Sequence, residues 1–143
     1  EAIKQLKARY FRSLDAKRWE DFGAVFTDDA RLEMPADVPG SITVGRAAIV
    51  AMVGAGVGQA VTVHHGHMPE IEITGPASAR GIWAMEDWLE FPGDPPALVV
   101  HGRGHYHEVY ERGADGAWRI KSLRLERLLL VHNGRRVVPQ TAP

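Results

Sequence analysis

Apolar side chains recur along one face of the first segment of the chain. Leu6, Tyr10 and Leu14 are spaced four residues apart, and Phe11 extends the same face. This spacing follows the 3.6-residue period of an α-helix. The pattern therefore predicts a helix over about residues 3–15.

Weaker patterns follow this helix. Trp19, Phe22 and Phe26 are spaced to favour a second helix. Residues 27–30 are rich in turn formers, and an alternation of apolar and polar side chains then predicts a short strand over residues 30–34.

A loop and a third helix are predicted next. Residues 35–40 contain two prolines and a glycine and predict the loop, whereas the apolar residues 46–53 predict the helix. The glycine-rich run 54–58 is expected to end that helix. This run is not a phosphate-binding loop, because it follows a helix and lacks the ending Gly-Lys-Ser/Thr.

From residue 61 onward the chain is typical of β-structure. Long segments of alternating apolar and polar side chains are separated by short turns, and Asn133-Gly134 is a strong hairpin sequence. The predicted strands span residues 61–73, 79–91, 98–111, 118–131 and 135–138, with a loose tail at residues 141–143.

Three helices followed by four long strands predict an α+β fold class. We expect one domain over residues 1–143, because a chain of this length buries a single hydrophobic core. Long antiparallel strands with helices on one face tend to curl. We therefore predict a cone-shaped, strongly curved, mostly antiparallel sheet, with the N-terminal helices packed on it around a single pocket.

Composition narrows the class of function. The formal net charge is -1 and lysines and arginines do not cluster beyond a local triplet, so we expect no nucleic-acid partner. The sequence has no cysteine, which excludes disulfides and thiolate metal sites. No apolar run reaches the roughly 18–20 residues that span a bilayer, so we expect no membrane partner and a cytoplasmic location.

Seven histidines raise the question of a metal site. Side chains alternate between the two faces of a strand, so His65 and His67 share one face and His64 takes the other. His105 and His107 form a similar pair. Two histidines with a carboxylate are one interpretation, but no helical zinc-binding spacing is present, and half-exposed sheet residues are the simpler one. We predict no metal and no cofactor.

Two aspartates are placed unusually. Asp15 falls at the end of the first helix, where the macrodipole disfavours negative charge. It either caps the second helix or faces a pocket as a semi-buried base. Asp87 shares a strand face with Trp83, Met85 and Leu89, so it either pairs with an arginine across the sheet or faces the pocket. A histidine beside such a carboxylate can exchange protons near neutral pH.

The third long strand contains Gly102 and Gly104, which indicate a sharp bend or the close approach of a ligand. Gly104, Tyr106, Glu108 and Tyr110 share one face of this strand. Tyr106 would form either a pocket wall or part of the core.

Together these features resemble the SnoaL-like group of the nuclear transport factor 2-like (NTF2-like) superfamily, over about residues 1–139. The segments that carry the resemblance are residues 10–15, Trp19, residues 26–30, residues 104–112 and residues 115–120. The resemblance implies the NTF2-like, or cystatin-like, α+β fold. It does not specify a reaction, because the superfamily contains several kinds of enzyme and also binding modules.

Within that group the pattern is similar to scytalone dehydratase, hexachlorocyclohexane dehydrochlorinase and bile acid 7α-dehydratase. In these enzymes an aspartate closing the first helix pairs with a histidine at the start of the first long strand, and Asp15 and His64 fall at those places. Tyr10 and Asp87 match two further residues of the bile acid enzyme, the latter as a second acid twenty-three residues after His64. The resemblance also implies an active-site arginine near the start of the last long strand. It has no clear match, because Leu123 occupies the aligned position.

The resemblance implies a cofactor-independent dehydratase, which is a lyase. His64, oriented by Asp15, would remove a proton, and Tyr10 or a protonated Asp87 would donate one to the leaving or enolate oxygen. An isomerase or a polyketide cyclase would use the same residues. In a non-catalytic binding module or dimerisation domain, Asp15 and His64 would form a structural pair. Residues 54–60 and the tail would cover the pocket mouth.

The expected substrate is a small, bulky, hydrophobic molecule with a steroid- or polyketide-like skeleton. Arg124 and Arg127 lie near the position of the expected arginine. A homodimer or homotrimer is expected to form through the outer sheet face, where His105, His107 and Val109 lie. The side chains predicted to bind substrate are Trp83, Met85, Leu89, Tyr106, Leu123, Leu125 and Arg127.

Overall fold

The computed structural model describes residues 1–137. The chain begins with two helices, α1 (Ala2–Asp15) and α2 (Trp19–Ala24), and a third helix, α3 (Arg46–Val57), precedes the long strands. The N-terminal helix predicted from the apolar periodicity is confirmed. Among the described residues, no helix has the length and apolar character needed to cross a membrane.

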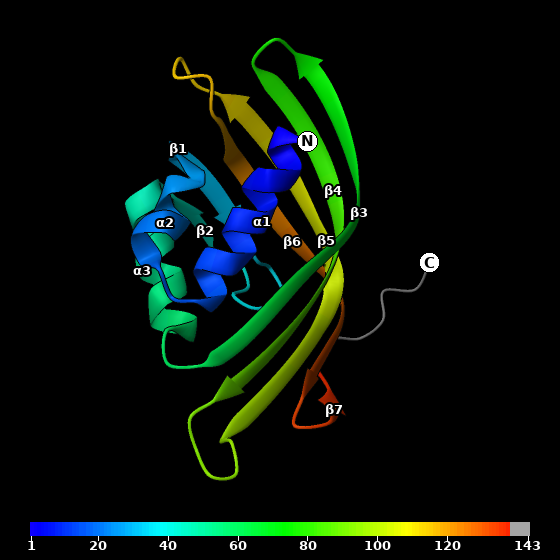
Figure 1. Ribbon diagram of the computed structural model, residues 1–143. Coiled ribbons are helices and arrows are strands. Elements are labelled where there is room, and N and C mark those ends of the chain that lie inside the picture. The colour runs from blue at the N-terminus through cyan, green and yellow to red at the C-terminus, as the bar shows by residue number, and fades with distance from the viewer. Residues whose placement is uncertain (138–143) are drawn as a thin grey trace.

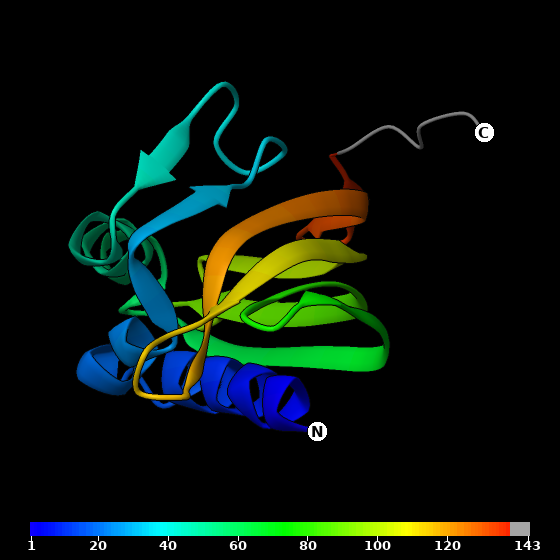
Figure 2. The ribbon, with the colours of Figure 1, turned by 90° about the horizontal axis from the view of Figure 1, so that it is seen from above.

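The strands form one curved, open sheet. Its neighbouring strands are, in order, β2 (Ile42–Val44), β1 (Phe26–Glu33), β6 (Trp118–His132), β5 (Leu98–Arg112), β4 (Ser78–Phe91) and β3 (Val61–Gly75), and β7 (Arg135–Arg136) pairs with β6. Of the described pairings, only that of β1 with β6 is parallel. The helices lie on one side of the sheet, which curls toward them (Figure 1, Figure 2). The predicted α+β class and curved antiparallel sheet are confirmed.

The boundary between α2 and β1 differs from the sequence prediction. Phe26 begins β1 rather than extending a helix, and it is fully buried opposite Ile120 of β6. Residues 27–30 are therefore strand and not turn. The helix-like spacing of Phe22 and Phe26 arises because both side chains enter the same core from different elements.

The predicted end of α3 is also wrong, because the helix continues through Gly54 and Gly56 to Val57. Glycine costs about 1 kcal/mol at an interior helix position. A methyl group at Gly54 would make an ordinary van der Waals contact of 3.9 Å with the indole ring of Trp19, so the packing does not require glycine at this position. The short strand β2 was not predicted. Residue 138 of the predicted last strand and the predicted tail lie outside the described residues.

The hydrophobic core lies between α1 and the concave face of the sheet. Gly66 of β3 faces α1, and a Cβ atom there would be 2.7 Å from the ring of Phe11, so glycine allows the helix to approach this strand closely. That approach brings Asp15, at the end of α1, beside the start of β3. The core includes Ile3, Leu6, Leu14, Phe22, Phe26, Ile49, Trp83, Tyr106, Tyr110 and Leu123.

Candidate active site

Asp15 and His64 form a hydrogen-bonded pair where α1 meets β3. Oδ1 of Asp15 lies 2.6 Å from Nδ1 of His64, and Oδ2 accepts a hydrogen bond from the backbone N–H of His64 at 2.9 Å. Oδ1 also accepts one from the hydroxyl of Thr62 at 2.9 Å. The N-cap residue of α2 is Arg18, so the interpretation of Asp15 as a helix cap is wrong.

These hydrogen bonds favour the charged form of Asp15. Partial burial raises the pKa of its carboxyl group, but hydrogen bonds from the side chain and backbone of His64 and from Thr62 lower it, and the net pKa is below the usual 3.8. A carboxylate acceptor at Nδ1 selects the imidazole tautomer that carries its proton there. Nε2 of His64 is then the nitrogen that can accept a proton.

Nε2 of His64 faces a buried ion pair formed by β4 and β6. It lies 4.0 Å from Oδ2 of Asp87, whose carboxylate accepts a hydrogen bond from Nη1 of Arg127 at 2.8 Å. Arg127 also donates to Asp37, in the loop between β1 and β2, from Nη2 at 3.1 Å and from Nε at 3.2 Å. The interpretation of Asp87 as the partner of an arginine across the sheet is confirmed.

The charge of Arg127 is stabilised by both of its partners. Burial alone would lower the pKa of the guanidinium, but Asp87 and Asp37 raise it above its ordinary value. The guanidinium therefore stays positively charged, and it is linked to His64 through the carboxylate of Asp87, which lies 4.0 Å from Nε2. Such a charge can stabilise a carbanion, an enolate or a leaving anion.

Gly102 provides the space that this ion pair occupies. A Cβ atom at this position would lie 2.1 Å from Nη1 of Arg127 and 2.4 Å from Oδ1 of Asp87. Gly104 lies at a β-bulge between β5 and β6, where a Cβ atom would be 1.9 Å from the carbonyl oxygen of Glu126. These close approaches are made by protein groups of the neighbouring strands, whereas the sequence suggested a ligand.

A cavity of about 300 Å³ lies beside Arg127. Among the seven residues predicted to bind substrate, Leu89 and Arg127 line this cavity. The other five, Trp83, Met85, Tyr106, Leu123 and Leu125, belong to the hydrophobic core under α1. Gly56 and Val57, from the segment predicted to cover the mouth, are also in the lining. The polar and apolar side chains that line the cavity include Asp37, Val57, Leu89, Val100, Arg127 and Leu130.

Tyr10 lies deeper in the fold than this cavity, in a cluster of aromatic rings. Its ring contacts those of Phe11 and Tyr106 edge-on. Burial, followed by the charge of Glu108, raises its pKa well above 10, so the phenol is neutral at physiological pH. Tyr10 therefore contacts one predicted site residue, Tyr106, but does not line the cavity.

A buried charge pair that sequence reasoning missed lies beside Tyr10. Nζ of Lys7 forms a salt bridge with Glu108, and neither side chain is exposed to solvent. Nζ also lies 3.9 Å and 3.8 Å from the ring centres of Tyr10 and Tyr106. One sequence signal was available, because Lys7 lies between Ile3 and Tyr10 on the apolar face of α1.

Asp37 and Thr62 are two further polar residues of the site that sequence reasoning missed. Asp37 lies in a loop, and the sequence of that loop does not indicate that Asp37 pairs with Arg127. Thr62 precedes His64 by two residues on the same strand face, so the alternation of β3 predicts that it faces inward with His64. Its hydroxyl also accepts a hydrogen bond from Nζ of Lys17 at 2.6 Å.

The SnoaL-like domain family matches residues 1–124. This chain belongs to the SnoaL-like family. Solved structures with the same NTF2-like fold support the assignment. A candidate scytalone dehydratase from Novosphingobium aromaticivorans has a TM-score of 0.79 at 21% identity, covering 91% of this chain and 84% of the other.

Two further structures extend the comparison. A type 3 hexachlorocyclohexane dehydrochlorinase from Novosphingobium barchaimii has a TM-score of 0.78 at 18% identity, covering 96% of this chain and 92% of the other. A protein from Kribbella flavida has a TM-score of 0.82 at 21% identity, covering 92% and 91%. At these identities the likeness establishes the fold of this SnoaL-like protein, and the reaction has to be argued from its site.

Proposed function

We propose that this SnoaL-like protein is a dehydratase that uses His64 as general base, oriented by Asp15. The observation that carries the proposal is the hydrogen bond of 2.6 Å between Nδ1 of His64 and Asp15, with Nε2 directed toward the Asp87–Arg127 ion pair. One nitrogen is held by a carboxylate, and the other faces Asp87, whose partner Arg127 carries the positive charge that can stabilise the product of deprotonation.

In the proposed reaction, Nε2 of His64 removes a proton from the carbon next to an activating carbonyl group. The electron pair of that bond is stabilised as an enolate by the guanidinium of Arg127. It then forms the carbon–carbon double bond as the neighbouring carbon–oxygen bond breaks. The proton on Nε2 returns to the leaving hydroxyl group, so water is released and His64 is again neutral.

This mechanism assigns the role of charge stabiliser to Arg127, which sequence reasoning had placed among the substrate-binding residues. Asp87 accepts hydrogen bonds from Arg127 and therefore acts as its positioning partner. Tyr10 is buried among aromatic rings, where it would have a packing role. The catalytic roles predicted for Tyr10 and Asp87 remain predictions.

The cavity beside Arg127 supports the substrate class, and its lining reaches the site through Arg127 and not through His64. Its volume of about 300 Å³ is at the lower end of the range for ligand pockets, and Leu89, Val100 and Leu130 make it mainly apolar. A compact steroid- or polyketide-like ketone with a β-hydroxyl group would suit it. We infer that a substrate oxygen replaces Asp37 on Arg127, because Asp37 comes from a loop and binds the guanidinium next to the cavity.

The energetics of the site favour an enzyme over a non-catalytic binding module. Burying the Asp87–Arg127 pair beside His64 requires removing two charges from water, a cost of several kcal/mol per ion that mutual attraction only partly offsets. An apolar lining would bind an apolar ligand without that cost. Charged groups that converge on a basic nitrogen are more useful for moving a proton.

The test is a ligand screen by thermal shift, followed by product analysis. Hydroxy-ketone and enone steroids and aromatic polyketides are incubated with the wild-type protein, with Asp15→Asn and with His64→Ala. The wild-type protein should bind a subset and release the dehydrated product. Both variants should retain the fold and lose at least about 100-fold in kcat/KM, as expected for loss of a general base.

His105→Ala is the matched control, because His105 lies on the opposite face of the sheet and should leave turnover unchanged. A rearranged product without loss of water would replace the dehydratase assignment with an isomerase or cyclase. Binding without any product, in the wild-type protein as in the variants, would make the protein a carrier.

A further inference from the structure

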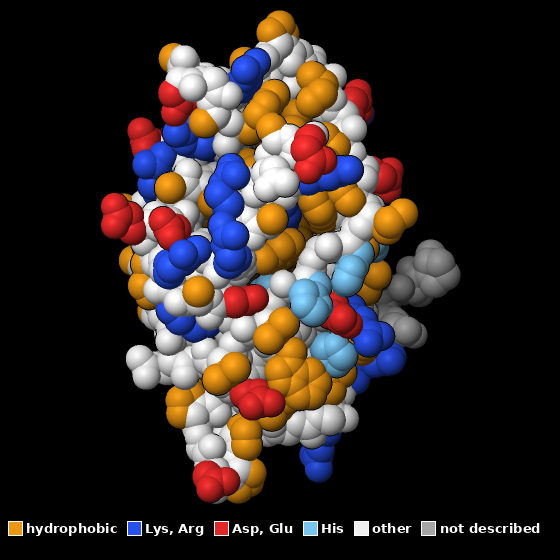
Figure 3. Space-filling model, viewed as in Figure 1, with side chains coloured by type: hydrophobic (Ala, Val, Ile, Leu, Met, Phe, Trp, Pro, Cys, Tyr) orange, Lys and Arg blue, Asp and Glu red, His pale blue; other side chains and the backbone are white. Residues whose placement is uncertain are grey.

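The outer face of the sheet, away from the helices, carries a cluster of histidine side chains. Figure 3 shows histidines gathered in the region of β3 and β4, next to acidic and basic side chains. The reaction proposed above involves none of them, since His64 points to the inner face. We propose that His65, His67 and Glu86 form a binding site for a divalent transition-metal ion of the Zn²⁺ or Ni²⁺ type.

The backbone register brings these three side chains together. His65 of β3 is directly opposite Glu86 of β4, and His67 lies two residues further along β3, so it emerges on the same face. One ligand atom from each residue can be chosen so that all three lie within 4.8 Å of one another. Two imidazoles and a carboxylate, on adjacent strands, are a donor set that zinc uses in proteins.

Small side-chain rotations would complete the geometry. Bond lengths of about 2.0–2.1 Å around tetrahedral zinc place neighbouring ligand atoms roughly 3.3 Å apart. Both histidines are exposed and Glu86 is half-exposed, so these rotations meet little resistance from packing. The backbone therefore need not move for the three donors to reach one ion.

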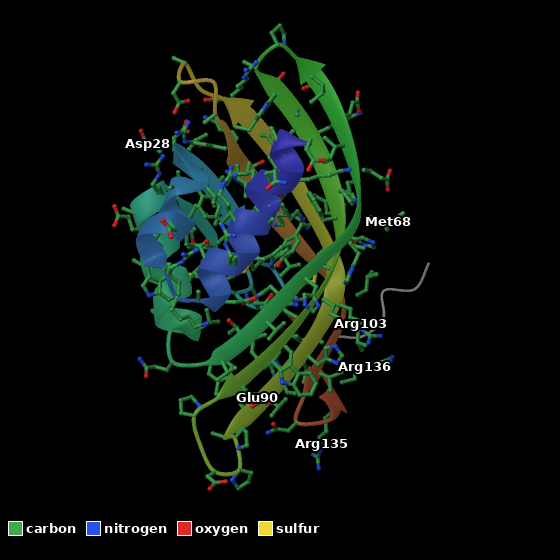
Figure 4. The ribbon with its side chains drawn as sticks, viewed as in Figure 1. Asp28, Met68, Glu90, Arg103, Arg135 and Arg136 are labelled. Carbon is green, nitrogen blue, oxygen red and sulfur yellow. The ribbon has the colours of Figure 1, made fainter. Side chains whose placement is uncertain are left out.

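The two oxygens of Glu86 have different partners, which leaves one for a cation. Oε2 accepts from Nε of Arg103 at 3.1 Å and lies 3.5 Å from Nε2 of His101. Oε1 instead faces His65, with 4.0 Å between it and Nδ1. Figure 4 shows Arg103 on the side of the sheet away from the helices.

A second histidine pair on the same face provides an internal comparison. His105 and His107 are also two residues apart, and their ring centres are 6.4 Å apart, against 6.0 Å for His65 and His67. However, Nε2 of His107 already binds Glu126 at 2.9 Å. Within residues 1–137, the three residues proposed here are the one group whose ligand atoms converge.

Three protein ligands would leave a coordination position that faces solvent. Water, or a donor atom from another molecule, would occupy it, as in zinc sites with three protein ligands. The proposed metal does not enter the reaction at His64, which lies on the opposite face of the strand. The metal site and the reaction at His64 can therefore be tested independently of each other.

The experiment is isothermal titration calorimetry of ZnCl₂, and separately NiCl₂, into tag-free protein. The wild-type protein should bind one ion per chain. His67→Ala and Glu86→Gln should each weaken binding by at least about tenfold, as expected when a ligand of a three-residue site is lost. The double variant H105A/H107A should bind as the wild type does.

Two variants are needed because Glu86→Gln also removes the partner of Arg103, whereas His67→Ala leaves that ion pair intact. Circular dichroism spectra that match the wild type would establish that the fold is unchanged. Absence of binding by the wild type would overturn the proposal. So would equal affinity of His67→Ala and the wild type, or loss of binding in H105A/H107A alone.

Discussion

Removing one partner of the buried pair of Lys7 and Glu108 should destabilise the fold strongly, because the other partner is then left buried without its counter-charge. Neither side chain is exposed to solvent, so replacing Lys7 by methionine leaves the carboxylate of Glu108 buried without its cation. Breaking a buried pair in this way costs about 3–5 kcal/mol. For a domain of this size, that loss lowers Tm by roughly 10 °C.

A double-mutant cycle measures how much of this loss belongs to the pair. Lys7→Met, Glu108→Leu and the double variant are unfolded in urea, with tryptophan fluorescence as the signal. Each single variant should lose about 3–5 kcal/mol of unfolding free energy. The double variant should lose about 2–3 kcal/mol less than the sum, because no charge is left unpaired.

The control is an exposed pair on the same part of the chain. Arg18 and Asp21 are 3.2 Å apart with side chains 51% and 61% exposed, so Asp21→Ala should change the unfolding free energy by less than about 1 kcal/mol. The reasoning would be refuted if Lys7→Met were no more destabilising than Asp21→Ala. It would also be refuted if the losses of the two single variants simply added in the double variant.

Two further predictions concern the site itself. Gly102→Ala should separate Asp87 from Arg127, because its Cβ would lie 2.1 Å from Nη1, and should lower stability in urea unfolding and turnover in product assays. Gly56→Ala, whose Cβ meets nothing within 4 Å, should not lower stability. The folded-state pKa of Asp15 is lowered, so the stability that it contributes is present above its unfolded pKa of 3.8 and is lost as pH falls through the folded value. The stability difference between the wild type and Asp15→Asn should therefore shrink between about pH 5 and pH 2 in urea unfolding curves; a constant difference would contradict this linkage.

The elements with strong periodicity were predictable from sequence. α1 has a continuous apolar face, and the first part of β3 and most of β4 to β6 alternate, so their type and inner faces follow from local physics. The same alternation places Leu123, Leu125 and Arg127 on one face of β6, which explains why Arg127 reaches the site. The end of α3 was not predictable, because the helix continues through two glycines that propensity disfavours.

Long-range pairing limited what sequence could reveal about the site. Lys7 and Glu108 are 101 residues apart in the chain, and no local pattern indicates that they meet. Asp37 lies in a loop, where hydrophobic periodicity carries no information about contacts. Asp15 and His64 were proposed through a family resemblance, and their hydrogen bond depends on the close approach of α1 to Gly66, a tertiary feature.

The central claim is that His64 removes a proton from carbon, and hydrogen–deuterium exchange tests it most directly. A steroid ketone that binds the wild-type protein but lacks a leaving group is incubated in D₂O, and deuterium at the carbon next to its carbonyl group is followed by NMR. We expect the wild type to catalyse this exchange and His64→Ala to fall at least about 100-fold below it. Exchange at the wild-type rate in His64→Ala would contradict the account.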